Sequence, residues 1–403
     1  MKGPSTSLPS TSLRTGKTGL TAGLIREAKA AAKDVIRPTP LVYSTSFSSL
    51  FGTDIYLKLE NLQKTGSFKP RGAYNKIRSL TGEEKKRGVI AASSGNHAQG
   101  VAWAATFCGV KSTIVMPETA PITKRVATAG YGASVVSHGS SFDEACARAI
   151  GIAAEKALTF IHPFDDELVM AGQGTIGLEI IEALPDVSTV IVPVGGGGLI
   201  SGIATAVKEA RKNVKVIGVK ARSTRAGIVT IADGIAIKKI GERPSRVIKK
   251  YVDDILSVSD VFIAEAILKL IERKKLVVEG AGAVGLAALM EGGLRAKGKT
   301  VIVLSGGNID VTTLDRVIRL GLLKDGRVTR LAVEIADVSG ALANLTSELA
   351  ALKSNILHVI HMRDAIEVPI GRTKVELILE VEDNSHAKRI RKRLKEKGYE
   401  TEV

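Results

Sequence analysis

Short apolar segments rich in β-branched residues alternate with alanine-rich segments over residues 55–320. The apolar segments, which are the expected strands, comprise residues 88–92, 112–116, 133–136, 189–194, 215–219 and 300–304. Continuous apolar strands separated by helices form parallel sheets that helices cover on both faces. Ligands bind such sheets beyond the carboxyl ends of the strands. The alternation therefore predicts an α/β fold with parallel sheets and a ligand site made by the loops that follow them.

A run of glycines follows one of these strands, 189–194, and precedes an expected helix over 199–208. The run consists of Gly195, Gly196, Gly197 and Gly198. A glycine run by itself is often a flexible linker. Between a strand and a helix, however, it aims backbone N–H groups and the positive end of the helix at an anion. Glycine has no side chain to block a phosphate, so the run predicts a phosphate-binding loop.

A lysine lies in the short polar segment 67–73, which reads SFKPRGA. Lys69 offers an amine that can form an imine if desolvation or a neighbouring positive charge lowers its pKa. Arg71, two residues further on, is a candidate for that charge. Most loop lysines are solvated surface charges, but this one accompanies a phosphate-binding loop. Together the two features predict a phosphorylated aldehyde cofactor, pyridoxal 5′-phosphate (PLP).

Two further loops follow expected strands and carry polar side chains. The loop 93–99 has N–H groups and hydroxyls that can hold a carboxylate, and Asn96 can donate to the oxygen on the cofactor ring. His97 is either an acid–base group or, as is commoner for a histidine at a helix start, a capping or packing residue. Ser305, after the strand 300–304, either meets the pyridine nitrogen or caps a helix.

The composition excludes several classes of partner. The 403 residues suffice for two or three domains. The net charge of +16 comes from scattered Lys and Arg with few aromatics, so we expect no nucleic-acid binding. No signal peptide is expected, and the best membrane candidate, 276–290, is short and contains Glu279, so we expect no membrane partner. Cys108 and Cys146 suit a reduced compartment and give no metal pattern, which predicts a cytoplasmic protein without a metal.

The two ends of the chain differ in composition from its middle. Residues 1–20 are rich in Ser, Thr, Gly, Pro and Lys without an acid, which predicts a disordered tail, and an amphipathic helix is expected over 20–36. A further shift comes near 324–326. The segments beyond it are expected strands at 329–335, 355–362 and 373–381 and expected helices at 339–353 and 385–397. Their βαββα order predicts a small ferredoxin-like unit.

Taken together, these motifs resemble the threonine dehydratase (threonine ammonia-lyase) family, PLP enzymes of fold type II with the tryptophan-synthase β-like fold. The similar segments are 67–73, 93–100, 195–198, 230–234 and 305–308, and also 58–65 and 162–166. The resemblance covers residues 24–322. The part from residue 329 onwards resembles an ACT domain, an amino-acid-sensing module.

The resemblance implies roles for individual residues. Lys69 would form the Schiff base with PLP, Phe68 and Gly234 would flank its ring, and Ser305 would accompany its pyridine nitrogen. The implied cofactor-binding residues are Phe68, Lys69, Asn96, Gly195, Gly196, Gly197, Gly198, Leu199, Gly234 and Ser305. The implied substrate-binding residues are Ser94, Gly95, Asn96 and His97.

The resemblance also implies domains and a reaction. We expect a large PLP domain over 21–54 and 158–323, a small mobile domain over 55–157, and an ACT-like regulatory domain over 328–403. L-threonine would be converted to 2-oxobutanoate and ammonia, with L-serine to pyruvate as a side activity. Lys69 would remove the α-proton and the β-hydroxyl would then leave. We expect an amino-acid effector and a homodimer or homotetramer.

Some residues depart from the family pattern, and some alternatives stay open. Lys220 stands where family members often have a glutamate that helps to hold a cation, and the stretch 220–230 is short. We hypothesise that the Lys220 ammonium substitutes for the ion. Ser339 stands where the ACT pattern often has proline. The alternatives are a serine racemase or serine dehydratase, with Ser94 as a second proton donor, and a non-catalytic amino-acid sensor.

Overall fold

The computed structural model describes residues 19–222, 230–237, 239–363 and 368–402. Apart from residues 19 and 20, the predicted N-terminal tail lies outside this range. The chain forms two compact units, Met1–Asp310 and Val311–Val403.

The larger sheet of the first unit has six strands in the order β1-β2-β10-β7-β8-β9. The strands are β1 (Leu41–Tyr43), β2 (Ile55–Leu59), β7 (Thr189–Pro193), β8 (Lys215–Ala221), β9 (Asp254–Val258) and β10 (Thr300–Leu304). All neighbours are parallel except β1 and β2, which are antiparallel. The predicted strands 300–304 and 189–194 agree with β10 and β7 almost to the residue. The antiparallel strand at the edge, β1, was not predicted as a strand.

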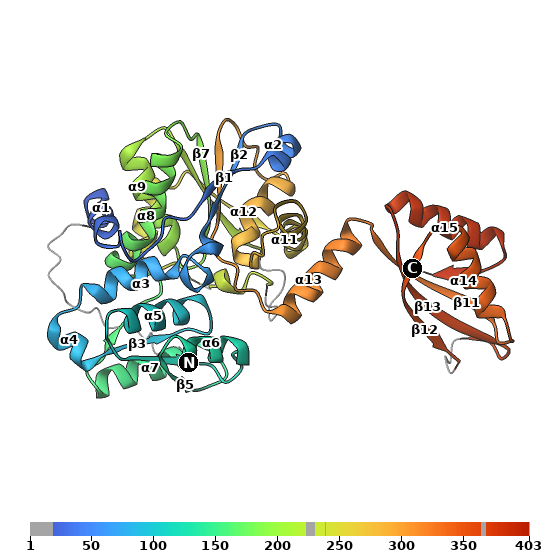
Figure 1. Cartoon of the computed structure of the whole chain (residues 1–403), viewed down its shortest axis with the longest axis horizontal. Coiled ribbons are helices and arrows are strands. Elements are labelled where there is room, and N and C mark those ends of the chain that lie inside the picture. Colours follow the sequence, from blue (N-terminus) through green and yellow to red (C-terminus); the bar gives the residue numbers. More distant parts are fainter. Residues whose placement is uncertain (1–18, 223–229, 238, 364–367, 403) are drawn as a thin grey trace, which may run out of the picture. The chain divides into compact units, whose positions relative to one another are not determined.

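Helices cover both faces of this sheet, as continuous apolar strands require. Figure 1 shows α8 and α9 on one side of the strands and α11 and α12 on the other. Val190 and Val192 of β7 pack with α8 and α9, while Ile191 faces Gly285 of α12. The helices of this half are α1 (Ala22–Ala31), α2 (Thr45–Phe51), α8 (Glu167–Ala183), α9 (Gly198–Ala210), α10 (Glu242–Tyr251), α11 (Asp260–Lys274) and α12 (Gly280–Met290). We call this half the large lobe.

A second, four-stranded parallel sheet has the order β5-β4-β3-β6. Its strands are β3 (Val89–Ala92), β4 (Ser112–Met116), β5 (Ser134–Ser137) and β6 (Thr159–Phe160). The helices α3 and α5 pack on one face of this sheet and α7 packs on the other. The helices are α3 (Lys69–Arg78), α4 (Gly82–Arg87), α5 (Asn96–Phe107), α6 (Ile122–Gly130) and α7 (Phe142–Glu155). We call residues 82–160 the small lobe, and α3 directly precedes it.

Two boundaries differ from those expected. The predicted small domain begins at residue 55, yet β2 pairs with β10 in the larger sheet, where Ile55 and Leu57 are completely buried. The chain enters the small lobe only after two short 3-10 turns, Glu60–Leu62 and Lys64–Gly66, and α3. The predicted large domain extends to residue 323, whereas α13 (Val311–Lys324) groups with the second unit.

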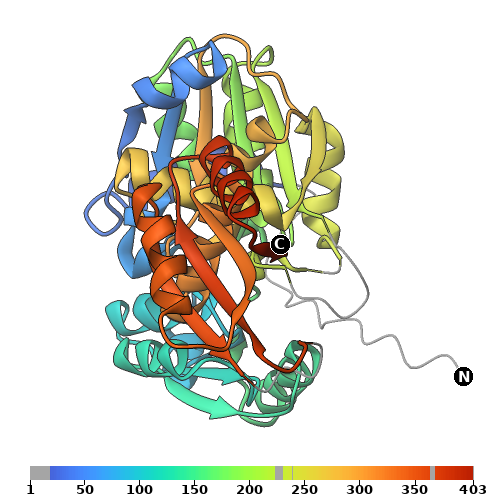
Figure 2. The same cartoon turned by 90° about the vertical axis from the view of Figure 1, so that its right-hand side faces the viewer.

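The second unit contains an antiparallel sheet with the order β12-β13-β11-β14. Its remaining elements are β11 (Val328–Ala336), α14 (Ala341–Ala351), β12 (Asn355–Met362), β13 (Arg372–Glu380), α15 (Asn384–Glu396) and β14 (Glu400–Glu402). Figure 2 shows these strands and helices in orange to red. The βαββα order predicted from the sequence is present, and β14 adds a strand of three residues too short and polar to produce an apolar pattern.

Candidate active site

The segments that carry Lys69 and Ser305 lie against each other. Ser67 forms an isolated bridge with Gly306, and the Phe68 amide donates to the Ser305 carbonyl at 3.1 Å. Both segments follow neighbouring strands, since β2 and β10 are paired in parallel. The fold thus brings the predicted amine and the predicted hydroxyl to one edge of the larger sheet.

Lys69 is the first residue of α3 and is partly buried rather than exposed on a polar turn. Its Nζ donates to the Pro163 carbonyl at 3.1 Å and lies 5.1 Å from the centre of the Phe68 ring. Burial lowers the pKa of Lys69 to about 8, against the opposing attraction of Glu279. The sequence left open whether desolvation or a neighbouring cation would lower this pKa. In the structure, desolvation lowers it.

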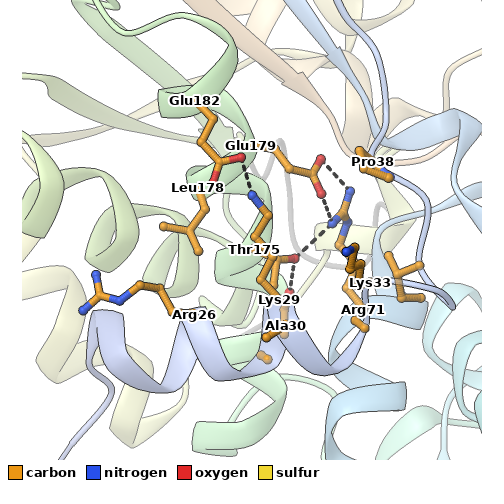
Figure 3. A pocket seen from close by; sticks show the side chains of 14 residues that line it. Arg26, Lys29, Ala30, Lys33, Pro38, Arg71, Thr175, Leu178, Glu179 and Glu182 are labelled. Atoms are coloured by element: carbon orange, nitrogen blue, oxygen red, sulfur yellow. Dashed lines mark hydrogen bonds and ion pairs between the residues drawn. The ribbon is translucent and has the colours of Figure 1, made fainter.

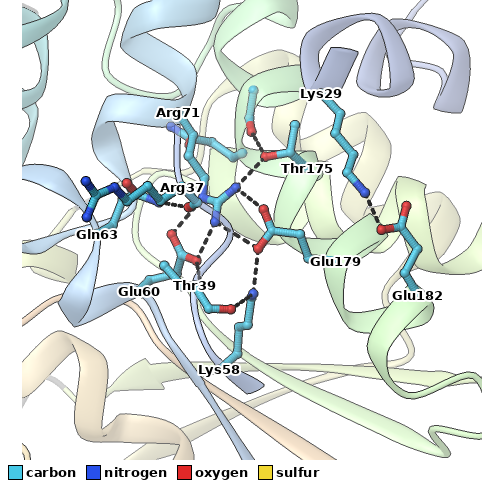
Figure 4. Close-up of polar contacts among 12 residues, drawn as sticks. Lys29, Arg37, Thr39, Lys58, Glu60, Gln63, Arg71, Thr175, Glu179 and Glu182 are labelled. Carbon is cyan, nitrogen blue, oxygen red and sulfur yellow. Dashed lines mark hydrogen bonds and ion pairs between the residues drawn. The ribbon is translucent and has the colours of Figure 1, made fainter. Parts of the chain in front are cut away.

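Arg71 instead belongs to a buried charge cluster, which we define as Lys58, Glu60, Arg71 and Glu179 (Figure 4). Arg71 Nε donates to Glu60 at 2.8 Å and its other nitrogens reach Glu60, Glu179 and Thr175. Two cations thus face two carboxylates, and every guanidinium nitrogen has a partner. The cluster ties α3 to β2 and α8, which fixes the helix that carries Lys69.

Asn96 opens α5 and is held on both sides of its amide. Its Nδ2 donates to the two carboxylate oxygens of Glu279 at 2.8 and 2.9 Å. Its Oδ1 accepts from Asn308 Nδ2 at 2.8 Å. Ser94 and Gly95 precede it and are partly buried. The predicted carboxylate loop therefore lies beside the segment that follows Ser305.

His97 finds its hydrogen-bond partner outside this loop. Its side chain is 3% exposed, and its Nε2 lies 2.9 Å from the Ile161 carbonyl. Burial, with Lys69 nearby, lowers the pKa of His97 to about 3. The imidazole is thus neutral at physiological pH, which favours the packing interpretation over the acid–base one.

Glu279 is the site residue that sequence reasoning missed. It precedes α12, is 4% exposed, and has a pKa raised to about 7 by burial and by Asp233. Any side chain at Gly306 would collide with its carboxylate, because a Cβ there would lie 2.5 Å from Oε1. The available signal was a single acid inside the apolar stretch 276–290. Its partner Asn96 is 183 residues away, which no local pattern reveals.

The glycine run forms the turn between β7 and α9. Gly197 has a φ of +93°, and α9 begins at Gly198 with Leu199 in its first turn. A Cβ at Gly196 would lie 2.2 Å from the Phe164 ring, and one at Gly195 would lie 3.1 Å from Ile235. Packing therefore requires glycine at these positions, in addition to the predicted binding of an anion. Ile235 follows Gly234 in the 3-10 turn Asp233–Ile235, so this predicted residue also adjoins the loop.

A separate cavity of about 420 Å³ lies between α1 and α8 (Figure 3). Arg26 and Lys29 line it from α1, Lys33 lines it from the turn after α1, and Thr175, Leu178, Glu179 and Glu182 line it from α8. None of the predicted cofactor residues contributes to its lining. It lies behind Arg71 and is distinct from the candidate site.

A metal was not expected. In the described part of the chain, no group of three or more His, Cys, Asp and Glu side chains is arranged to hold one. Lys220 lies in β8 opposite Ser257, while residues 223–229 fall outside the described ranges. The hypothesis that Lys220 replaces a cation stays a prediction. Among the described helices, none is both long and apolar enough to cross a membrane.

The residues present fit PLP. Lys69 supplies an amine of lowered pKa, and the turn 195–198 supplies backbone N–H groups at the start of a helix of thirteen residues. The buried Ser305 directly precedes the segment 306–308, and Asn96 bonds to Asn308 of that segment. An aldehyde and a phosphate are the groups that this donor set accommodates.

Comparisons with known proteins agree with this fit. A family model described as pyridoxal-phosphate dependent enzyme matches residues 32–306. L-threonine ammonia-lyase of Thermotoga maritima is 51% identical over 394 residues, which cover 94% of this chain and 98% of that protein. The structure of processed threonine deaminase isoform 2 from Solanum lycopersicum matches with a TM-score of 0.70 at 34% identity, over 79% of this chain and 94% of that one.

Maize serine racemase is also similar in structure, with a TM-score of 0.71 at 33% identity over 76% of this chain and 99% of that one. The resemblance to threonine ammonia-lyases inferred from the motifs is confirmed at 51% identity. The parallel sheets of the first unit fit PLP fold type II. The chain belongs to the family of pyridoxal-phosphate dependent enzymes.

Proposed function

We propose that this enzyme is a PLP-dependent threonine ammonia-lyase, which converts L-threonine to 2-oxobutanoate and ammonia and accepts L-serine as a second substrate. The observation that carries the proposal is the 51% identity to L-threonine ammonia-lyase over 94% of the chain. The desolvated Lys69 supports it independently, since its Nζ donates to the Pro163 carbonyl and the adjacent Phe164 packs against Gly196 of the glycine turn.

The residues that would hold the cofactor follow from the site. Backbone N–H groups of the turn 195–198 and of Leu199 would bind its phosphate, Asn96 would contact its ring oxygen, and Ser305 would meet its ring nitrogen. Phe68 and Gly234 would flank the ring. When bound, PLP supplies an electron sink for the α-carbon of an amino acid. A neutral serine at the ring nitrogen does not enforce protonation there.

Lys69 is the base in this proposal. With a pKa near 8, about a tenth of its amine is neutral at pH 7, against less than a thousandth at the ordinary value of 10.5. The neutral amine takes the α-proton of the substrate and holds it at Nζ. Glu279, whose charge attracts the Lys69 ammonium, stabilises that state. The N–H groups of the loop 94–97 at the start of α5 hold the substrate carboxylate.

The test is production of 2-oxobutanoate from L-threonine by the PLP-loaded protein, beside Lys69→Ala. We expect product from the wild type and none from the variant, which also lacks the visible absorbance of the lysine-bound cofactor. A wild type that binds PLP and yields no 2-oxobutanoate would overturn the proposal.

Serine racemase is the second candidate, because the maize enzyme matches the fold closely. Racemisation needs a proton donor on the face opposite Lys69, and Ser94 of the loop before α5 is available for that role. Chiral analysis of serine after incubation with the enzyme separates the two activities. D-serine formed faster than pyruvate would favour the racemase.

The second unit is proposed to be an ACT-like regulatory domain that binds an amino acid and pairs with a second copy. Its six-element βαββαβ order and antiparallel sheet support this. The edge strand β12 adds support, because Leu357, Val359 and Ile360 are exposed on it. Such pairing would make the enzyme a homodimer or a homotetramer. The free cysteines, Cys108 and Cys146, are compatible with the cytoplasmic location that stays a prediction.

Deletion of residues 324–403 tests the regulatory part. We expect the shortened enzyme to keep its activity on L-threonine and to lose any response to isoleucine or valine. A truncated enzyme that responded to these amino acids like the full chain would refute the regulatory assignment.

A further inference from the structure

An ion pair joins the two lobes beside the candidate site. Lys124 Nζ of α6, in the small lobe, lies 2.7 Å from Asp233 Oδ2 of the large lobe. The Lys124 side chain is only 16% exposed, whereas Asp233 is 53% exposed. A lysine on an exposed helix is thus directed inward to meet a carboxylate on the other lobe.

Asp233 occupies a firmly anchored turn. It starts the 3-10 turn Asp233–Ile235 and directly precedes Gly234. Thr230 bonds to Asp260, and the Ala232 amide donates to Thr230 Oγ1 at 3.2 Å. The carbonyl of Ile231 packs against Gly280, where a Cβ would lie only 2.4 Å from it. The turn that carries this carboxylate is therefore anchored at the start of α12.

α6 is held more lightly. Of its nine residues only Thr128 is buried, and Ile122 and Val126 are exposed. The ion pair across the lobe boundary therefore adds to the few buried contacts that hold this helix. Pairs of this exposure change an equilibrium by a factor of only about 1.5 to 5, so the contact is weak enough to break and re-form at every turnover.

The pair lies beside another contact between the lobes. Asn96 of the small lobe bonds to Glu279 of the large lobe. A Cβ at Gly234 would lie 3.6 Å from a Glu279 oxygen, so Asp233 and Glu279 are neighbours. Lys124 and Asp233 therefore lie at the boundary of the lobes where the predicted carboxylate loop meets the large lobe.

We propose that Lys124 and Asp233 form a latch between the two lobes beside the site, which holds the small lobe closed over the cofactor and a bound amino acid. Both are positioning residues, since neither belongs to the predicted cofactor or substrate set. The latch requires only the cofactor. Its effect on KM for L-threonine rests in addition on the proposed function.

The test measures access to the cofactor. Hydroxylamine attacks the carbon bonded to Lys69, forms a new C=N bond and releases the lysine amine, so visible absorbance falls. It is mostly uncharged at neutral pH, and altered charges do not steer it. We expect Lys124→Ala and Asp233→Asn each to raise this rate by about 2- to 5-fold at low salt, and the doubly exchanged protein, Lys124→Asp with Asp233→Lys, to regain the wild-type rate.

The signs separate a latch from an effect through Glu279. Lys124 lowers the pKa of Glu279 and Asp233 raises it, so an effect transmitted by that carboxyl would have opposite signs in the two single variants. A latch predicts the same sign in both. Salt at 1 M should accelerate the wild type towards the single variants and leave those variants unchanged.

A matched pair serves as the control. Lys299 and Asp186 also lie 2.7 Å apart, with exposures of 34% and 63%, but both belong to the large lobe. Exchanging their charges should leave the hydroxylamine rate unchanged.

Single latch variants that react like the wild type, or an exchange at Lys124 and Asp233 that fails to restore the rate, would overturn the latch. KM for L-threonine should rise with the hydroxylamine rate while kcat changes less than 2-fold. If the single variants react faster with hydroxylamine as expected but the enzyme does not turn over L-threonine, the result would instead count against the proposed function.

Discussion

At the scale of single residues, the site combines two groups whose pKa values move toward neutrality from opposite directions. Burial lowers the pKa of Lys69 to about 8 and raises that of Glu279 to about 7. Burial disfavours the charged form of each group, yet the two opposite charges attract each other. A proton can therefore reside on either group at little cost near neutral pH, which suits a lysine that must gain and lose one in each cycle.

Glu279→Gln tests the buried carboxyl through stability. The folded protein retains a proton on Glu279 that the unfolded chain releases as pH rises from about 4.5 to 7, so the wild type loses stability across this window. The amide cannot ionise. We expect the unfolding free energy of the wild type, relative to the variant, to fall by about 3 kcal/mol at most between pH 4.5 and 8. Urea titrations at several pH values measure it, and a difference independent of pH would contradict the raised pKa.

The same variant should change the titration of Lys69. Glu279 raises the pKa of Lys69, so its neutralisation moves that pKa below 8. The pH at which the apo-protein captures PLP at half its maximal rate should decrease, as followed by visible absorbance. Glu182→Gln, at an exposed acid of α8, is the control and should leave the midpoint near pH 8. An upward shift in Glu279→Gln would show that the two groups are not coupled as described.

At the scale of elements, close helix contacts depend on glycine. α3 and α8 cross where Gly72 meets Gly172, and a Cβ at Gly172 would lie 2.4 Å from the Arg71 carbonyl. A backbone atom cannot yield as a flexible side chain can. The helix that carries Lys69 is therefore positioned by the absence of a side chain on its neighbour.

Gly172→Ala should accordingly destabilise the protein by about 1–3 kcal/mol, because it overpacks this crossing. Gly151→Ala in α7 is the control, since no atom lies within 4 Å of its added Cβ. That substitution should be neutral or stabilise by about 0.4–1 kcal/mol. Denaturant midpoints measure both. Equal effects of the two substitutions would mean that α3 moves freely to accommodate a methyl group.

Most elements could be predicted because their signals are local. The strands 112–116 and 300–304 coincide with β4 and β10. The assignment of β2 to the larger sheet could not be predicted, because its partner β10 begins 245 residues beyond Ile55, at Thr300. Motifs likewise pointed to Lys69, Asn96 and the glycine turn, whereas Glu279 and Phe164 act through contacts that only the folded chain creates. The roles proposed for the cofactor-binding residues stay predictions.

At the scale of the whole molecule, the exposed edge of the second unit is the feature that most favours assembly. An unpaired edge strand with apolar side chains is a template for pairing with another chain. β12 has such an edge, and Leu357 and Ile360 are exposed on it. Pairing of β12 with a second copy would bury these residues and satisfy the free backbone groups.

Leu357→Lys combined with Ile360→Lys should therefore reduce the molar mass of the assembly in solution, since buried like charges oppose pairing. Val338→Lys is the control, because Val338 is also exposed but lies between β11 and α14. Light scattering after size-exclusion chromatography measures the masses. An unchanged mass in the double variant would place the subunit interface elsewhere.

The strand order of the larger sheet also has a consequence for how the chain folds as it is synthesised. β10 lies between β2 and β7, so the two halves of the sheet stay unjoined until residues 300–304 leave the ribosome. The four strands of the small lobe, by contrast, are continuous in sequence from residue 89 to 160 and need no later segment to pair. The small lobe can form its sheet first, while the edges of β2 and β7 remain unpaired. Any nascent chain that stalls before residue 300 exposes those edges, and unpaired apolar strand edges are prone to aggregation.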